Sequence, residues 1–124
     1  MKTILVVDDE KDICFFLKAN LELTGKYKVV VETSPKNAFH AAATCKPALI
    51  LLDIMMPVMD GFEVLKRLKA NDATMNIPVA MLTGQGDQKS QERALGLFNE
   101  DYIIKPVNMT DLMARIDAIL SRTR

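Results

Sequence analysis

The stretch ALILLDIMMPVMDG, residues 48–61, constrains the fold of this chain more than any other feature. Residues 49–52 show no alternation of apolar and polar side chains, which is typical of a strand buried on both faces. The next residue is Asp53, and carboxylates are almost never buried without a partner. Asp53 therefore lies either where the strand leaves the sheet or beside a group that compensates its charge.

Short apolar runs alternate with longer segments of helical spacing along the rest of the chain. Strands are predicted over residues 4–8, 28–32, 48–53, 77–83 and 102–105, and helices over residues 10–26, 35–45, 62–71 and 87–98 and after Asn108. This strict alternation predicts a parallel sheet with helices on both faces. The expected fold class is α/β, a doubly wound (βα)5 flavodoxin-like three-layer sandwich. Its strand order, 2-1-3-4-5, is chosen partly by analogy.

Local signals mark the ends of several helices. Gly25 is a natural C-terminal stop for the first helix. Ser34–Pro35 looks like an N-cap followed by proline at the first helical position. Asp60 is expected only to cap the helix after it, and Asn108 with Asp111 three positions on resembles a capping box.

Composition limits the function. A chain of 124 residues suits one domain. The 16 basic residues equal the 16 acidic ones, which argues against a dedicated nucleic-acid binder. No apolar run approaches the roughly 20 residues of a membrane helix, and the start MKTILVVDDE is a poor signal peptide. We expect a cytoplasmic protein with no direct nucleic-acid or membrane partner.

The cysteines and the single histidine suggest no chemistry. Cys14 and Cys45 fit no metal spacing and no Cys-x-x-Cys motif, so two reduced structural thiols are expected. His40 has no second metal ligand nearby and is expected at the surface or half-buried.

Polar residues stand at the ends of four predicted strands: Asp8–Asp9, Asp53, Thr83 and Lys105. The carboxyl ends of parallel strands meet at one edge, where ligands bind in open α/β sheets. Strand ends also meet water, which explains any one of these residues but explains the set poorly. Converging carboxylates repel one another, and a lysine or a hard cation such as Mg²⁺ relieves the repulsion.

This set of groups suits phosphoryl transfer, which needs positioning and charge neutralisation more than acid–base chemistry. Carboxylates are known phosphoryl acceptors. Lys105 supplies a point charge for a phosphoryl oxygen, and Thr83 supplies a hydroxyl donor. A rigid buried strand would then present Asp53 for attack on phosphorus.

The segments VVDDE, LLDIMMPVMDGFE, MLTG and DYIIKP occur together, in this order, over essentially the whole chain. In these motifs and their spacing the chain resembles response-regulator receiver domains of two-component signalling, of the single-domain chemotaxis or phosphorelay type. The resemblance implies one receiver domain over residues 1–124 without an output domain. It also implies a histidine kinase or histidine phosphotransfer protein as the partner.

The resemblance implies roles for the acidic residues. Asp53 is the phosphoacceptor. Asp9 and Asp53 ligate Mg²⁺ (or Mn²⁺) together with the backbone carbonyl of Met55, and Asp8 supports the metal through water. The apolar side chain of Met55 cannot orient an attacking water, so we expect slow self-dephosphorylation.

The resemblance also implies a switch. Lys105 contacts the phosphoryl group, and Thr83 reorients to bond it. Tyr102 matches the family's switch aromatic, with an ordinary strand aromatic as the alternative. The shift would alter the surface formed by residues 87–98, residues 102–105 and the last helix, which would control a downstream partner or pair two copies.

Three turn positions match the family. Pro57 and Gly61 shape the loop beside the acceptor, and the peptide bond between Lys105 and Pro106 is expected to be cis. The pair Phe98–Asn99 departs from the family's usual Gly-Ala, which affects the partner-facing surface rather than the chemistry.

The run ICFFL is longer than one buried helical stripe can hold. Some of Ile13, Phe15 and Phe16 are therefore expected to reach the surface near the acidic edge and form a docking patch for a kinase helix. The alternative, that the sheet and the last helix cover all three, is equally open.

Two other classes of function compete with a switch that catalyses its own phosphorylation and dephosphorylation. A phosphatase or phosphotransferase for small molecules would carry a second Asp where Met55 stands, and a cap domain. A degenerate receiver used only for binding would lack Asp53, Asp9 or Lys105, and all three are present. We therefore expect the switch and not a metabolic enzyme.

Overall fold

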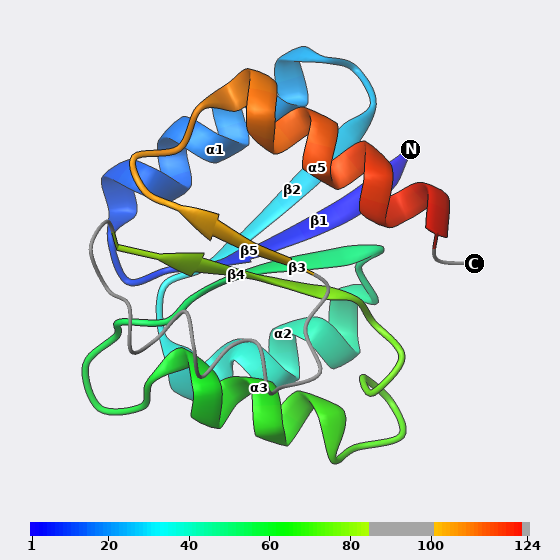
Figure 1. Ribbon diagram of the computed structural model, residues 1–124. Coiled ribbons are helices and arrows are strands. Elements are labelled where there is room, and N and C mark those ends of the chain that lie inside the picture. The colour runs from blue at the N-terminus through cyan, green and yellow to red at the C-terminus, as the bar shows by residue number, and fades with distance from the viewer. Residues whose placement is uncertain (85–100, 123–124) are drawn as a thin grey trace.

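The computed structural model describes residues 1–84 and 101–122 (Figure 1). Its elements are β1 (Lys2–Val7), α1 (Lys11–Leu23), β2 (Tyr27–Glu32), the 3-10 turn η1 (Pro35–Asn37), α2 (Ala38–Cys45), β3 (Leu49–Asp53), α3 (Gly61–Lys69), β4 (Val79–Thr83), β5 (Asp101–Ile104) and α5 (Met109–Arg122). The strands form one parallel sheet in the order β2-β1-β3-β4-β5. This confirms the predicted fold class and strand order. The helix predicted over residues 87–98 lies outside the described residues.

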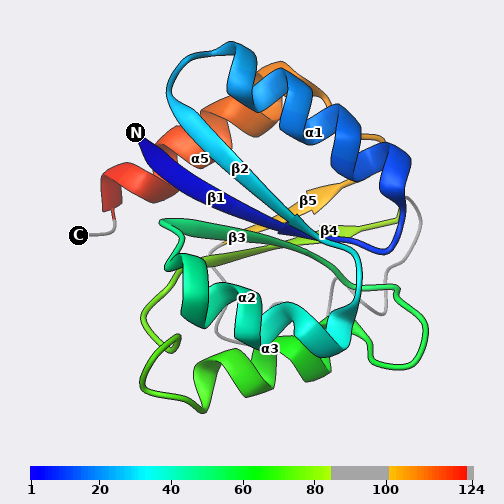
Figure 2. The same cartoon turned by 180° about the vertical axis from the view of Figure 1, so that it is seen from behind.

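Helices cover both faces of the sheet: α1 and α5 lie on one face, α2 and α3 on the other (Figures 1 and 2). Successive residues of a strand point to opposite faces. Leu49 and Leu51 therefore belong to the core on the α1–α5 side, and Ile50 and Leu52 to the core on the α2–α3 side. All four are fully buried. Because both faces of β3 are covered, its sequence needs no polar alternation.

Several helix-end predictions are confirmed. Asp60 Oδ1 accepts a hydrogen bond from the Glu63 N–H at 3.0 Å. Asn108 Oδ1 accepts one from the Asp111 N–H, also at 3.0 Å. Gly25 follows α1 with φ +73°, a conformation that favours glycine.

Ser34 is the N-cap by position and Pro35 is the first helical residue, as predicted, but the turn that they open is a 3-10 turn and not the predicted α-helix. The Ser34 side chain makes no capping hydrogen bond. The Asn37 N–H instead bonds to the Ser34 carbonyl at 3.1 Å, the i→i+3 pattern of a 3-10 turn. The α-helix therefore starts only at Ala38.

The cysteines and the histidine lie as predicted. Cys14 is buried and Cys45 half-buried, both as free thiols, and His40 is exposed. Among the described residues, no helix has the length and apolar character to cross a membrane.

Candidate active site at the carboxyl edge of the sheet

Four strand ends meet at one edge of the sheet. The parallel register sets the end of β1 beside that of β3, β3 beside β4, and β4 beside β5. β1 and β5 end one residue earlier than predicted, so Asp8 and Lys105 begin the loops after these strands. The structure brings Asp8, Asp53 and Lys105 into direct contact.

Lys105 is the centre of this site. Its Nζ lies 3.0 Å from Asp8 Oδ2, 3.2 Å from Asp53 Oδ1 and 3.3 Å from Glu10 Oε1. One ammonium group is thus shared by three carboxylates. Burial alone would lower the pKa of Lys105, but its contacts with Asp8 and Asp53 raise it.

Asp53 ends a rigid, fully buried strand and is itself 2% exposed. Burial raises its pKa to about 6, helped by the charge of Asp8 and opposed by Lys105. Burial also raises the pKa of Asp8, against the lowering effect of a hydrogen bond from the Glu10 N–H and of Lys105. Asp53 thus lies both at a strand end and beside a compensating charge.

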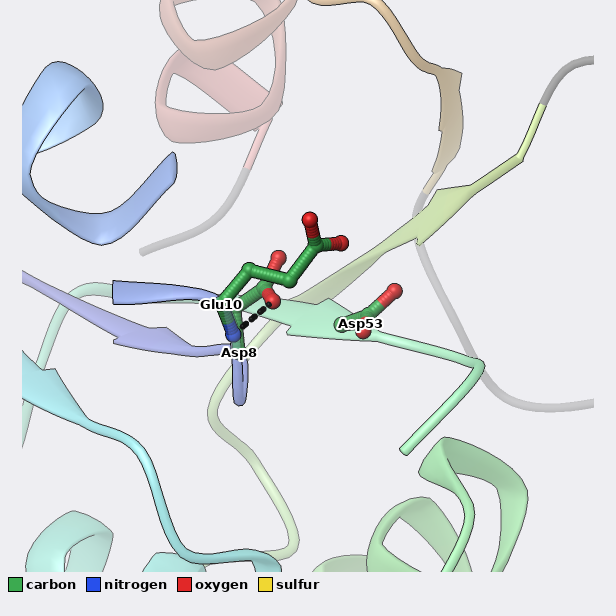
Figure 3. Close-up of side chains that lie close together, drawn as sticks. All are labelled: Asp8, Glu10 and Asp53. Carbon is green, nitrogen blue, oxygen red and sulfur yellow. Dashed lines mark hydrogen bonds between the residues drawn. The ribbon is translucent and has the colours of Figure 1, made fainter. Parts of the chain in front are cut away.

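Asp8, Glu10 and Asp53 form an acidic cluster in which one oxygen from each lies within 4.8 Å of the others (Figure 3). Glu10 was not among the predicted site residues. The available signal was its position as the third acid of the run Asp8–Asp9–Glu10. Which of three consecutive acids points into a site depends on how the chain turns after β1, and periodicity does not show that.

Asp9, a predicted metal ligand, lies outside this cluster and is half-buried. Its Oδ1 is buried and accepts no hydrogen bond from the described residues, and the same holds for Asp53 Oδ2. Buried carboxylate oxygens without a donor are costly. A hard cation with a preference for oxygen ligands fits this donor set.

The two predicted switch residues lie on neighbouring strands. Thr83 ends β4, is fully buried, and has its hydroxyl 3.5 Å from the Gly84 carbonyl, at the limit of a hydrogen bond. Tyr102 lies on β5, half-buried, and packs against the core on the α2–α3 side.

The loop after β3 passes close to the acceptor. A Cβ at Gly61 would collide with the backbone oxygen of Asp53, and the Gly61 N–H donates to the Ile54 carbonyl at 2.8 Å. Pro57 is exposed and Met55 is 66% exposed. The peptide bond between Lys105 and Pro106 is cis, as expected.

Two of the three apolar residues considered in α1, Phe15 and Phe16, reach the surface. Ile13 is half-buried against the core, whereas Phe15 is 75% and Phe16 44% exposed. A groove of about 530 Å³ lies beside Lys105 and is lined by Glu10, Asp12, Ile13, Phe16, Lys105, Pro106 and Val107. Phe15 is not among its lining residues.

Comparison with known proteins agrees with this geometry. Residues 4–117 match the response regulator receiver domain family. The phosphate regulon transcriptional regulatory protein PhoB of Pseudomonas aeruginosa is 39% identical over 122 residues, which are 98% of this chain and 53% of that protein. The alkaline phosphatase synthesis transcriptional regulatory protein PhoP of Bacillus subtilis is 40% identical over 122 residues, 98% of this chain and 50% of that protein. The chain thus spans about half the length of these relatives.

Solved structures give the same result. The receiver domain of the Francisella response regulator 1452 is 30% identical and superimposes with a TM-score of 0.88, covering 100% of both chains. Receiver domains are signalling components of two-component systems rather than metabolic enzymes; they accept phosphoryl groups from histidine kinases and bind Mg²⁺ at an acidic pocket. The chain belongs to the family of response regulator receiver domains.

Proposed function

We propose that this chain is a phosphorylation-dependent switch in which Asp53 accepts a phosphoryl group from a histidine kinase or a histidine phosphotransfer protein. The observation that carries the proposal is the pairing of a buried Asp53 with Lys105 at 3.2 Å. Asp53 Oδ2 accepts no hydrogen bond from the described residues. This oxygen is therefore available as the nucleophile.

In the transfer, an oxygen of Asp53 forms a bond to phosphorus while the bond from phosphorus to the partner's histidine nitrogen breaks. The electron pair of that bond stays on the nitrogen. Lys105 neutralises charge on the phosphoryl oxygens, the main requirement of such a reaction. The pKa of about 6 leaves Asp53 mostly ionised at neutral pH.

Mg²⁺ or Mn²⁺, when bound, would neutralise further phosphoryl charge. We assign its ligands to Asp9, Asp53 and the backbone carbonyl of Met55, with Asp8 acting through water. The buried Oδ1 of Asp9, which accepts no hydrogen bond from the described residues, supports this assignment.

The switch in this proposal runs from Thr83 to the last helix. The Thr83 hydroxyl turns to the phosphoryl group, and Tyr102 moves inward on β5. Arg115 of α5 pairs with Asp101 of β5 at 2.9 Å, so a shift of β5 is transmitted to α5. Within the described residues, β5 and α5 then supply the face that controls a downstream partner or pairs two copies.

The kinase is proposed to dock on α1, where Ile13, Phe15 and Phe16 supply apolar contacts. Ile13 and Phe16 line the groove beside Lys105, so a helix seated there would lie close to the acceptor. Alanine at Phe16 is expected to slow transfer from the cognate kinase without changing phosphorylation by a small phosphodonor. Unchanged transfer from the kinase in this variant would show that the kinase does not dock on this surface.

Dephosphorylation is proposed to be slow because the exposed Met55 side chain offers no polar group to orient water. Met55→Asn and Met55→Glu are expected to shorten the lifetime of the acyl phosphate. A lifetime unchanged in both variants argues against this role.

The test of the acceptor is incubation with a small phosphodonor and Mg²⁺ followed by intact-mass measurement. Wild type is expected to gain the mass of one phosphoryl group and Asp53→Asn none. Asp72→Asn, at an exposed position away from the site, is the matched control and is expected to behave as wild type. An equal mass gain in Asp53→Asn would overturn the proposal.

A further inference from the structure

Glu10 has a position that its helix does not explain. It precedes α1 at the N-cap position, yet its side chain makes no capping hydrogen bond. Its Oε1 lies 3.3 Å from Lys105 Nζ, and its N–H donates to Asp8 Oδ1 at 2.9 Å. Figure 3 shows the Glu10 side chain extending over Asp8 on the side that faces Asp53. The Glu10 carboxylate thus contacts Lys105 in the site and does not cap α1.

The three carboxylates that contact Lys105 differ in how far their side chains are exposed. The side chains of Asp8 and Asp53 are 0% and 3% exposed, whereas that of Glu10 is 59% exposed. Asp8 and Asp53 are short and fixed at strand ends. Glu10 has one more methylene group and faces solvent, so it can follow the ammonium group when that group moves.

The Lys105 ammonium and a divalent cation bound at this site would share two buried carboxylates, those of Asp8 and Asp53. Nζ lies 3.0 Å from Asp8 and 3.2 Å from Asp53, and two positive groups at such distances repel each other strongly in a partly buried site. Lys105 must therefore move when a cation binds. Among the described residues, three carboxylates contact Lys105, and that of Glu10 is the one that is not buried.

We propose that Glu10 is a positioning residue for Lys105: it holds the ammonium group beside the acceptor while a divalent cation occupies the buried carboxylates. Lys105 is then free to pass from Glu10 to the phosphoryl group. Without the Glu10 carboxylate, Lys105 stays on Asp8 and Asp53 and competes with the cation. This inference rests on the proposed function, because it requires cation binding at this site.

Calorimetric titration of the whole chain with Mg²⁺, near physiological salt, tests the proposal. Glu10→Gln is expected to weaken Mg²⁺ binding about tenfold. The matched control is Glu63→Gln, which makes the same substitution at an exposed residue in the first turn of α3. Salt screens such an exposed charge, so the control is expected to weaken binding less than about twofold. Equal effects of the two substitutions would overturn the proposal.

A double-mutant cycle with Lys105→Met separates positioning from direct coordination. In the Lys105→Met background, Glu10→Gln is expected to weaken binding less than about threefold, because no ammonium is left to position. A tenfold loss in both backgrounds would mean that Glu10 acts on the metal itself and would refute the inference.

Glu10→Asp keeps the charge but shortens the reach, and it needs no Lys105 substitution. It is expected to bind Mg²⁺ as weakly as Glu10→Gln, and wild-type affinity in this variant would overturn the positioning role. If wild type itself fails to bind Mg²⁺, the proposed metal site is wrong. If wild type binds and Glu10→Gln binds equally well, only the role of Glu10 is wrong.

Discussion

Gly61 is the residue on which the loop beside the acceptor most depends. A Cβ there would meet the Asp53 backbone oxygen and lie 2.8 Å from Ile54 Cα, and backbone atoms cannot move aside cheaply. Gly61→Ala is expected to lower the free energy of unfolding by about 1–3 kcal/mol in urea denaturation. Gly84→Ala is the control, since a Cβ there meets nothing within 4 Å. Equal losses in the two variants would contradict the packing argument.

Val58, in the same loop, has an unfavourable backbone conformation. Its φ is +73°, a value that β-branched residues rarely adopt, and its side chain is 83% exposed. Asn tolerates this conformation. Val58→Asn is therefore expected to raise the free energy of unfolding by about 1 kcal/mol, while Val58→Ile leaves it unchanged. A loss of stability in Val58→Asn would show that the valine side chain contributes more than the strain costs.

The raised pKa of Asp53 makes stability depend on pH. The pKa is 3.8 ordinarily and about 6 in the folded chain, chiefly because of burial. The folded state therefore holds more protons than the unfolded state in this window, so Asp53 lowers stability as pH rises through it. Asp53→Asn is expected to have a higher free energy of unfolding than wild type in metal-free buffer. This difference is expected to be about 1–3 kcal/mol larger near pH 7.5 than near pH 4. Denaturation curves of both proteins at the two pH values measure this difference. A difference that does not change with pH would refute the prediction.

The strands and helices could largely be predicted from the sequence. Because both faces of the sheet are covered, its strands appear as continuous apolar runs. The first residues of some of these elements could not be predicted. β4 begins at Val79 rather than Ile77, since Pro78 lacks the N–H that a ladder needs. Ser34 begins a 3-10 turn through a local backbone bond. Periodicity shows which residues are buried but not which strands are neighbours, so the strand order follows only in part from the sequence pattern.

The candidate site was predictable in part for the same reason. Asp8, Asp53 and Lys105 follow from strand ends that share one edge of a parallel sheet. Glu10 does not, because it lies in the turn after β1, and the apolar pattern does not show where that turn directs its side chain. Only the folded chain brings the Glu10 and Lys105 side chains together.

One hydrogen bond joins β2 to α5 across the α1–α5 layer. The Tyr27 hydroxyl, on a residue 6% exposed, donates to Asp117 Oδ1 at 2.8 Å, and burial raises the pKa of Tyr27 to about 12. Tyr27→Phe is expected to lower the free energy of unfolding by about 1 kcal/mol. Asp117→Asn keeps a hydrogen-bond acceptor and is expected to lose less stability. Thermal denaturation of both variants measures these losses. A Tyr27→Phe variant as stable as wild type would show that the bond contributes nothing.

In the molecule as a whole, the sheet acts as a rigid frame that holds one acidic edge. β1, β3, β4 and β5 each deliver a group there, while α1 places apolar side chains next to it and α5 is tied to β5 by Arg115. The same frame thus connects the proposed acceptor with the proposed docking and output faces. Every one of these proposals requires that Asp53 be the residue that carries the phosphoryl group.

Borohydride trapping of the phosphorylated chain tests that requirement most directly, because it reduces an acyl phosphate to an alcohol and marks the modified residue. Peptide mapping by mass spectrometry is expected to find homoserine at position 53, only after treatment with phosphodonor and Mg²⁺. Homoserine at position 8, 9 or 10 with an intact Asp53 would contradict the account.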